Sequence, residues 1–385
     1  MLSYLSRNLS DLWGPLRLFG SNVFLMALGT LTAAILVQRM LPRLWHRLPK
    51  DHGKAILGPD GMKSEGKHTG AGYIVTLLAL PIYLLAVPWT WAELGAIAFL
   101  FFAMACGYLD DRAQVPWGQL KKGLLDAVAA IGVAACLYIG MVKGTGQLEY
   151  ARVWFPFWKG MVDVAWYVYI PSAAFFLWFI MNVTNCSDGV DGLAGTLTIV
   201  TLACLAAVLY LVIGNTRTAH YFLIDVGGTA SRCAARWAVM LMTSAGAFAG
   251  YLWWNAEPSK VLMGDAGSRF LGLLAGAGAL ATGNPLLIIA FMPVVIVNGG
   301  AGLAKLVLLR GFKKMGADVR PPREITEEER KRQNVIVRAV WAIRCPLHDH
   351  CKRNLKWSNA QVLMRFTLLQ LFLIPLLFTL FMKVR

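Results

Sequence analysis

Apolar residues form ten long stretches along this chain, separated by shorter polar segments. Each stretch holds about 17–25 residues, which lets a helix cross a hydrocarbon core of about 30 Å. The alternating ten-residue segments that are typical of an outer-membrane barrel are absent from the sequence. The pattern therefore predicts about ten transmembrane helices, at residues 22–41, 70–88, 91–109, 123–141, 166–184, 193–213, 234–252, 267–283, 285–309 and 363–382.

Two of these stretches have unusual compositions. The stretch at 267–283 is short and rich in glycine, and the stretch at 285–309 contains Pro293 and Gly299-Gly300. Proline removes a backbone donor, so we expect a break or kink inside the second of them.

The composition supports a membrane protein. Hydrophobic residues make up 57% of the chain and charged residues 15%, with a mean hydropathy of +0.55. A soluble domain has about 25% charged residues, so too few charges are present here to coat a water-facing surface. This excludes a soluble enzyme and a disordered chain. It predicts an all-α integral membrane protein whose residues 1–385 form a single polytopic domain.

The basic residues predict which side of the membrane each loop faces. Of the 37 Lys and Arg residues, 26 fall on the side that follows the odd-numbered stretches. The positive-inside rule makes that side cytoplasmic and, with ten crossings, places both termini in the periplasm. The predicted cytoplasmic loops are 42–69, 110–122, 185–192, 253–266 and 310–362. Within the last loop, residues 325–338 read as a short charged helix.

The seven cysteines suggest no disulfide framework, because their number is odd and no Cys-x-x-Cys pair occurs. Cys345 and Cys351 flank His348 and His350, but four ligands within seven residues rarely close one zinc tetrahedron.

Each predicted cytoplasmic loop carries residues that are unusual beside a membrane. Carboxylates at this depth are costly and are therefore candidates for function. They stand in Gly107–Arg112, in Asn182–Gly195 and in Met263–Ser268. Each motif alone is also explained by a helix cap or a polar turn. All of them, however, lie on the predicted cytoplasmic side of the membrane, which indicates a single site. The candidate site residues are Lys67, Thr69, Asp110, Asp111, Asn182, Asn185, Asp188, Asp191, Asn255, Asp265, His348 and His350.

The residue types point to a reaction class. Carboxylate and amide oxygens are ligands that suit Mg²⁺. The glycines in Asp188–Gly192 and Gly264–Gly267 allow close backbone approach and open helix N-termini, which suits phosphate. Together they predict a metal-assisted phosphoryl transfer at the cytoplasmic membrane face, between one soluble and one lipid-borne substrate.

The same motifs resemble those of the polyprenyl-phosphate N-acetylhexosamine-1-phosphate transferase family. The order of the three carboxylate motifs matches, and so does the loop Pro346-Leu-His-Asp-His350, followed by Trp357 and Arg365-Phe366. That loop is most similar to the phospho-N-acetylmuramoyl-pentapeptide transferase branch. The resemblance covers about residues 66–366.

This resemblance implies an Mg²⁺-dependent enzyme of the bacterial inner membrane. It would transfer phospho-MurNAc-pentapeptide from UDP-MurNAc-pentapeptide to undecaprenyl phosphate, giving lipid I and UMP in the first membrane step of peptidoglycan synthesis. The implied partners are these two substrates, membrane lipids and a second copy of the chain, with no nucleic acid.

The resemblance also implies roles for individual residues. Asp265 would bind Mg²⁺, and Asp110 would act as base or nucleophile with Asp111 beside it. The nucleotide pocket would contain Asn185, Asp188 and Asp191, with Asn255 near the metal. His348 and His350 would hold the phosphates or the sugar, and the further expected substrate contacts are Asn182, Thr69 and Lys67.

The sequence departs from the family pattern at a few positions. Asp349 replaces the middle histidine, Leu262 replaces an aromatic residue expected to stack on uracil, and Ser64 replaces a lysine. These positions affect the expected substrate contacts more than the reaction class.

Other functions fit the sequence less well. A transferase that loads N-acetylglucosamine-1-phosphate is the nearest alternative, and the loop from Pro346 to Trp357 argues against it. A CDP-alcohol phosphotransferase would need Ala-Arg after its Asp-Gly-x-x, whereas Gly192-Leu193 follow Asp191 here. A transporter would place its acidic residues near the bilayer midplane between repeats, and no repeat is visible.

Overall fold

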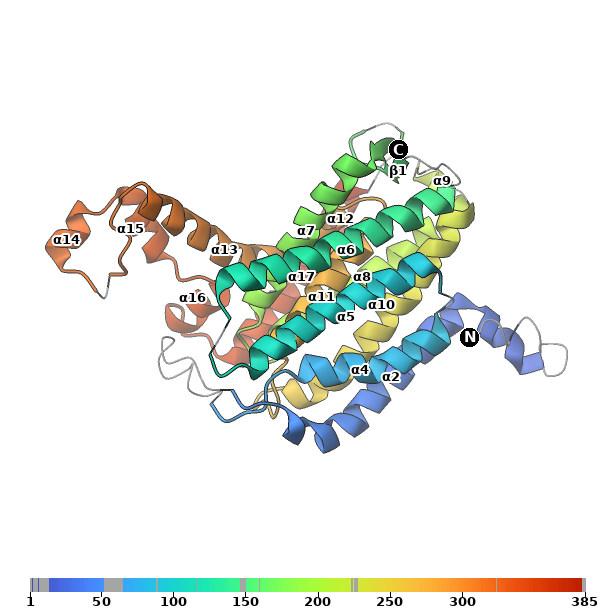
Figure 1. Ribbon diagram of the computed structural model, residues 1–385, viewed down its shortest axis with the longest axis horizontal. Coiled ribbons are helices and arrows are strands. Elements are labelled where there is room, and N and C mark those ends of the chain that lie inside the picture. The colour runs from blue at the N-terminus through green and yellow to red at the C-terminus, as the bar shows by residue number, and fades with distance from the viewer. Residues whose placement is uncertain are drawn as a thin grey trace.

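The computed structural model describes Leu2, Ser6 and residues 14–51, 65–87, 89–115, 117–145, 150–158, 160–222, 224, 228–322 and 324–382. Its long helices lie side by side in one bundle (Figure 1). Nearly all of the described secondary structure is helical, which confirms the predicted all-α class. The middle of the predicted loop 42–69, including Ser64, lies outside the described residues.

Each predicted apolar stretch coincides with a helix. Most are continuous helices: α2 (Asn22–Leu44), α4 (Ala71–Ala86), α5 (Trp91–Arg112), α6 (Gln119–Thr145), α7 (Trp166–Ser187), α8 (Leu193–Ala207), α10 (Gly228–Asn255), α11 (Gly264–Ala281) and α17 (Asn359–Phe381). A π-helical turn, Val208–Ile213, extends α8, and the short helix α9 (Thr216–Tyr221) follows. By length and composition, seven helices among the described residues can cross a membrane. The protein is therefore a multi-pass membrane protein, and the count of ten crossings stays a prediction.

The predicted break in the ninth stretch is confirmed. The stretch contains two helices, α12 (Leu287–Phe291) and α13 (Pro293–Lys314). Met292 between them leaves the helical conformation, with φ −129° and ψ 31°, and Pro293 opens α13. Proline fits the first turn of a helix because the backbone N–H that it lacks has no partner there in any case.

Helix α11 lies at the centre of the bundle, and nearly all its residues are buried. It packs against α4, α5, α7 and α8. A Cβ at Gly272 would lie 2.8 Å from Thr184, and one at Gly276 would lie 2.9 Å from Leu177. The glycine-rich composition that made this stretch unusual therefore lets α7 approach closely, as small residues do between membrane helices.

The first and last long helices have their outer ends at the same end of the bundle. Helix α2 runs parallel to α10, since Thr30 bonds Met242 O and Trp254 bonds Gln38 O. At the far end, Phe381 O accepts from Asn284 in the turn after α11. The start of α2 and the end of α17 therefore lie at the same end of the bundle, and the side of the membrane on which the termini lie stays a prediction.

A β-hairpin that the hydrophobic pattern did not predict covers that same end. Its strands β1 (Tyr150–Val153) and β2 (Val162–Ala165) pair antiparallel. Trp154 follows β1, is fully buried and donates to Thr282 O at 2.9 Å. Four-residue strands are too short for period-two alternation to distinguish them from a loop.

The expected helix at 325–338 is wrong in detail, because two helices replace it. These are α14 (Glu327–Arg332) and α15 (Val335–Ala342), and α16 (Leu347–Arg353) follows. Gln333 is extended, and the Asn334 side chain caps α15 by accepting from Ile336 N. Figure 1 shows α14 and α15 beyond the end of α13, away from the bundle.

The sidedness can be tested by thiol labelling in intact cells. In a background without the seven native cysteines, we expect Glu328→Cys to resist an impermeant maleimide until the cells are permeabilised. Asp163→Cys, on the hairpin at the opposite end, is the matched control and should label in intact cells. Labelling of Glu328→Cys before permeabilisation would invert the topology.

Candidate active site

The Asp111 carboxylate joins the end of α5 to the start of α11. Its oxygens accept from the backbone N–H groups of Asp265 at 3.0 Å and Ala266 at 3.1 Å. The first N–H groups of a helix have no partner inside the helix, so this carboxylate caps α11. A Cβ at Gly264, whose φ is +71°, would overlap the Asp111 carboxylate. Glycine at this position therefore permits the contact.

Asp110, the preceding residue, faces a different partner. Its Oδ2 pairs with the Lys122 ammonium of α6, and its Oδ1 accepts from Trp117 N at 2.9 Å. The same Lys122 Nζ lies 3.6 Å from Asp265 Oδ2. One cation therefore bridges two carboxylates that lie on different helices, far apart in the sequence. The two neighbouring aspartates therefore have separate surroundings.

A second cation supports this arrangement one helical turn along α11. Arg269 follows Asp265 by four residues and contacts its Oδ2 at 3.1 Å through Nη2. Its Nη1 contacts Asp126 Oδ1 on α6 at 2.5 Å, and both of these side chains are almost fully buried. A buried charge pair needs close mutual contact to offset desolvation, so this pair fixes α11 against α6.

Two amides of α7 complete the carboxylate centre. Asn185 donates to Ser268 Oγ at 3.0 Å and also hydrogen-bonds Asp265. Asn182, one turn earlier, donates to Trp178 O and hydrogen-bonds Asp126. Both amides therefore face the polar contacts of Asp265 and Asp126. We call Asp110, Asp265, Lys122, Arg269, Asp126 and Asn185 the carboxylate centre.

The turn between α7 and α8 carries Asp188 and Asp191. Asp191 Oδ2 accepts from Ser259 N at 3.3 Å and lies 3.8 Å from Lys67 Nζ. Lys67 also donates to Ser259 Oγ at 2.9 Å. The turn is thus joined to the loop that follows α10 and to the segment that precedes α4. We call residues 187–192 the α7–α8 turn.

Asn255 secures this turn through its backbone. Its Oδ1 accepts from Gly192 N at 2.8 Å, and its Nδ2 donates to Val261 O at 2.9 Å. The side chain is buried, and backbone groups occupy both ends of its amide. The structure therefore places Asn255 as a support for the turn.

The segment that precedes α4 lies next to the start of α11. Thr69 is buried, and its backbone N–H donates to Pro49 O at 2.9 Å. Gly70, with φ +82°, begins α4 in a left-handed conformation. A Cβ at Gly264 would overlap the backbone N of Gly70, and a Cβ at Gly70 would lie 3.4 Å from Asp111 Oδ2.

The two predicted histidines lie on α16 and have different surroundings. His348 is buried, and Asn298 of α13 accepts from its backbone N–H at 2.9 Å. Burial lowers the pKa of His348 to about 4, so the ring is neutral at pH 7. The Nδ1 of His350 instead accepts from Arg344 N at 3.4 Å.

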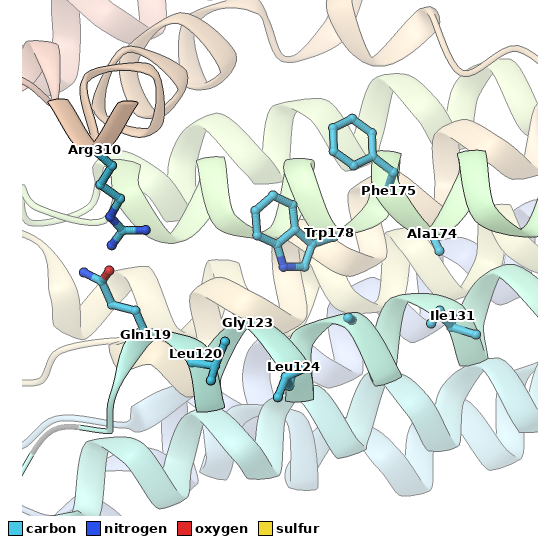
Figure 2. Close-up of a pocket in the computed structure, with 10 residues that line it drawn as sticks. Gln119, Leu120, Gly123, Leu124, Ile131, Ala174, Phe175, Trp178 and Arg310 are labelled. Carbon is cyan, nitrogen blue, oxygen red and sulfur yellow. The ribbon is translucent and has the colours of Figure 1, made fainter. Parts of the chain in front are cut away.

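An apolar groove opens between α6 and α7 (Figure 2). Its volume is about 700 Å³. Figure 2 shows Trp178 and Phe175 along one wall, and Gln119 facing Arg310 of α13 at one end. Gly123, which lines the groove, and Lys122 of the carboxylate centre are neighbours in sequence on α6.

The described residues hold no group of three His, Cys, Asp or Glu side chains close enough to bind a metal ion. All seven cysteines are free, as the sequence predicts.

Several residues of the site are missing from the sequence-based prediction. They are Lys122, Asp126, Arg269 and Asn298, all inside helices. Asp126 could have been found, since an acidic residue inside an apolar stretch is itself a signal of function. The contact between Asn298 and His348 joins positions 50 apart, and no local pattern predicts it.

Comparisons with known proteins identify the family of this chain. Residues 93–283 match the model of the glycosyl transferase family 4. The chain is 40% identical to a phospho-N-acetylmuramoyl-pentapeptide-transferase of Treponema pallidum subsp. pallidum, over 96% of this chain and 93% of that protein. The enzyme of the same name from Treponema pallidum strain Nichols gives the same values. The chain belongs to the phospho-N-acetylmuramoyl-pentapeptide-transferase family.

The capping role of Asp111 predicts a loss of stability. We expect Asp111→Ala to lower the free energy of unfolding by about 1–3 kcal/mol, because two partly buried N–H groups at the start of α11 lose their acceptor. Thermal unfolding of the purified protein measures this loss. Asp318→Ala is the control, since Asp318 forms an exposed pair with Arg320 and its removal should leave the midpoint unchanged. An unchanged midpoint for Asp111→Ala would contradict the capping role.

Proposed function

We propose that this protein transfers phospho-MurNAc-pentapeptide from UDP-MurNAc-pentapeptide to undecaprenyl phosphate, giving lipid I and UMP. The observations that carry the proposal are the pairing of Asp110 and Asp265 through Lys122 and an open apolar groove that α6 also lines. A phosphoryl transfer between a soluble and a lipid-borne substrate needs both features in one place. The names of the Treponema relatives support the same donor group.

The groove suits the carrier lipid. Its walls are mainly apolar, and Gln119 and Arg310 lie together at one end (Figure 2). The isoprenoid chain would lie against Trp178 and Phe175, with its phosphate near the polar end of α6. Arginine is a suitable partner for phosphate because its guanidinium can donate two hydrogen bonds at once.

The α7–α8 turn suits the donor. We assign Asp188, Asp191 and Lys67 to contacts with the UDP portion. The donor diphosphate would then extend toward Asn185 and the carboxylate centre. We assign His350, on α16, to the sugar or the diphosphate.

The reaction requires one bond to form and one to break. An oxygen of the lipid phosphate attacks the sugar-linked phosphorus of the donor, and the bond to the uridine-linked phosphate breaks, releasing UMP. Asp110 accepts the proton of the lipid phosphate or orients its oxygen. Lys122 and Arg269 stabilise negative charge near the reacting groups.

The carboxylate centre fits a divalent cation. Its acidic residues Asp110, Asp126 and Asp265 face two cations, Lys122 and Arg269. Asp265 is the most accessible of these three carboxylates, with 28% of its side chain exposed. We propose that Asp265 holds Mg²⁺ together with phosphate oxygens and water. The ion would offset the charge of the diphosphate and of departing UMP.

We place this reaction at the cytoplasmic face of the bacterial inner membrane. The excess of basic residues in the predicted cytoplasmic loops supports that orientation. A UDP-sugar made inside the cell would reach the α7–α8 turn from that side.

Asp265→Asn tests the metal assignment. We expect the purified variant to fold as wild type and to lose UMP release, because a neutral amide binds Mg²⁺ weakly. EDTA should silence the wild-type enzyme, and added Mg²⁺ should restore it. Turnover of Asp265→Asn near the wild-type rate would reject the assignment.

Asp110→Asn tests the role of the second carboxylate. General-base catalysis contributes about 10²–10⁴-fold, so we expect kcat to fall at least about 10²-fold with donor affinity retained. The assay compares UDP-MurNAc-pentapeptide with UDP-GlcNAc as donor. A folded Asp110→Asn variant with a rate within a few-fold of wild type would remove Asp110 from the mechanism. Release of UMP by the wild-type enzyme from UDP-GlcNAc alone would reject UDP-MurNAc-pentapeptide as the donor.

A further inference from the structure

Asn298 makes an unusual pair of contacts with one residue. It lies on α13 with 1% of its surface exposed. Its Oδ1 lies 2.9 Å from the backbone N of His348 and 3.2 Å from Nδ1 of the same residue. Both contacts converge on one oxygen, so the ring and the backbone of His348 are fixed together.

These two contacts determine where the ring carries its proton. A backbone N–H only donates, so the Asn298 atom that it meets is the acceptor oxygen. The Nδ1 that shares this oxygen must then carry a hydrogen. Because burial keeps the ring neutral at pH 7, as its lowered pKa shows, Nε2 is unprotonated.

The unprotonated edge of the ring lies against the α7–α8 turn. A Cβ built on Gly189 would overlap Nε2 of His348. Only a glycine fits between this ring and the turn. The position of the ring therefore sets the position of Gly189, which lies between Asp188 and Asp191.

Helix α13 holds the same turn at a second point. Ser187 Oγ donates to Val295 O at 3.2 Å, and a Cβ at Gly299 would overlap Val183 O. The start of the turn is thus packed directly on α13. Its middle is reached through His348.

Asn298 keeps this arrangement at a cost in stability. Its Nδ2 is buried and has no hydrogen-bond partner in the part of the chain that the structure describes. An unpaired buried donor is unfavourable, so an amide at this position calls for an explanation. Orientation of His348 by the other end of the amide provides one.

We propose that Asn298 is a positioning residue for donor binding, which fixes the α7–α8 turn through the ring of His348. This inference rests on the proposed function, because that function assigns the turn to the UDP portion of the donor. Asn298 and His348 then act on the donor through Gly189, without touching the reacting phosphates.

The test measures donor affinity and turnover separately. Asn298→Leu removes the shared acceptor, while Asn298→Asp keeps an oxygen for both donors. We expect Asn298→Leu to raise the KM for UDP-MurNAc-pentapeptide about 10–100-fold, the loss of affinity that corresponds to one buried hydrogen bond left unmade. The KM for undecaprenyl phosphate and kcat should stay within about threefold of wild type. Asn298→Asp should restore most of the donor affinity.

A matched control separates this effect from general loss of packing. Gln370 is another fully buried amide, which lies on α17 and donates to Leu197 O. We expect Gln370→Leu to leave the KM for the donor unchanged. A folded Asn298→Leu with unchanged donor KM would overturn the proposal. So would a fall in kcat at constant donor KM, since that would place His348 on the reacting groups.

A second variant tests the same link from the other side. Gly189→Ala puts a methyl group where the His348 ring lies, so it should also raise the donor KM. Because both changes break one link, the double variant with Asn298→Leu should be less impaired than the product of the single effects. Multiplicative effects would contradict a shared link.

Direct binding distinguishes this proposal from the proposed function. Calorimetry with UDP reports on the turn whether or not transfer occurs. Wild-type protein that releases no UMP from UDP-MurNAc-pentapeptide would reject the function alone. Equal affinity of wild type and Asn298→Leu for UDP would reject the positioning role alone.

Discussion

The backbone N–H groups of Asp265 and Ala266 lie in the first turn of helix α11, where they have no acceptor inside the helix. The Asp111 carboxylate accepts hydrogen bonds from both. This contact is possible only because α5 approaches α11 closely, and a Cβ at Gly107 would lie 2.5 Å from Asp265 O. The rest of the site depends on it, since Asp110 is the residue next to the cap and Asp265 is the first residue that is capped.

That dependence explains why two adjacent aspartates can have different roles. Successive helix residues point about 100° apart, so the carboxylate next to the cap must face elsewhere. Asp110 faces α6, where Lys122 bridges it to Asp265. The cap therefore sets the spacing between α5 and α11, and the Lys122 bridge depends on that spacing.

The sequence predicts the helices well and the contacts between them poorly. Long apolar stretches determine where α2 to α11 lie, and Pro293 determines the break before α13. The order of the motifs along the chain predicts that the carboxylates of α5 and α11 lie in one site. Pairs such as Asp126 with Arg269 cannot be read from either helix alone, because each is set by how two helices pack. Asn255 was expected near a metal, but its backbone contacts become visible only when α10 and Gly192 are seen together.

The histidine loop shows how a family motif and a local environment combine. The Asp349 carboxylate raises the pKa of the neighbouring His348 ring, because a negative charge favours the protonated form. Burial against α13 outweighs that effect and leaves the ring neutral. A neutral ring holds an anionic diphosphate weakly, whereas its shape and its fixed Nδ1 contact suit it to support a turn. The aspartate at position 349 is therefore compatible with the site, because the neighbouring ring is not required to be a cation.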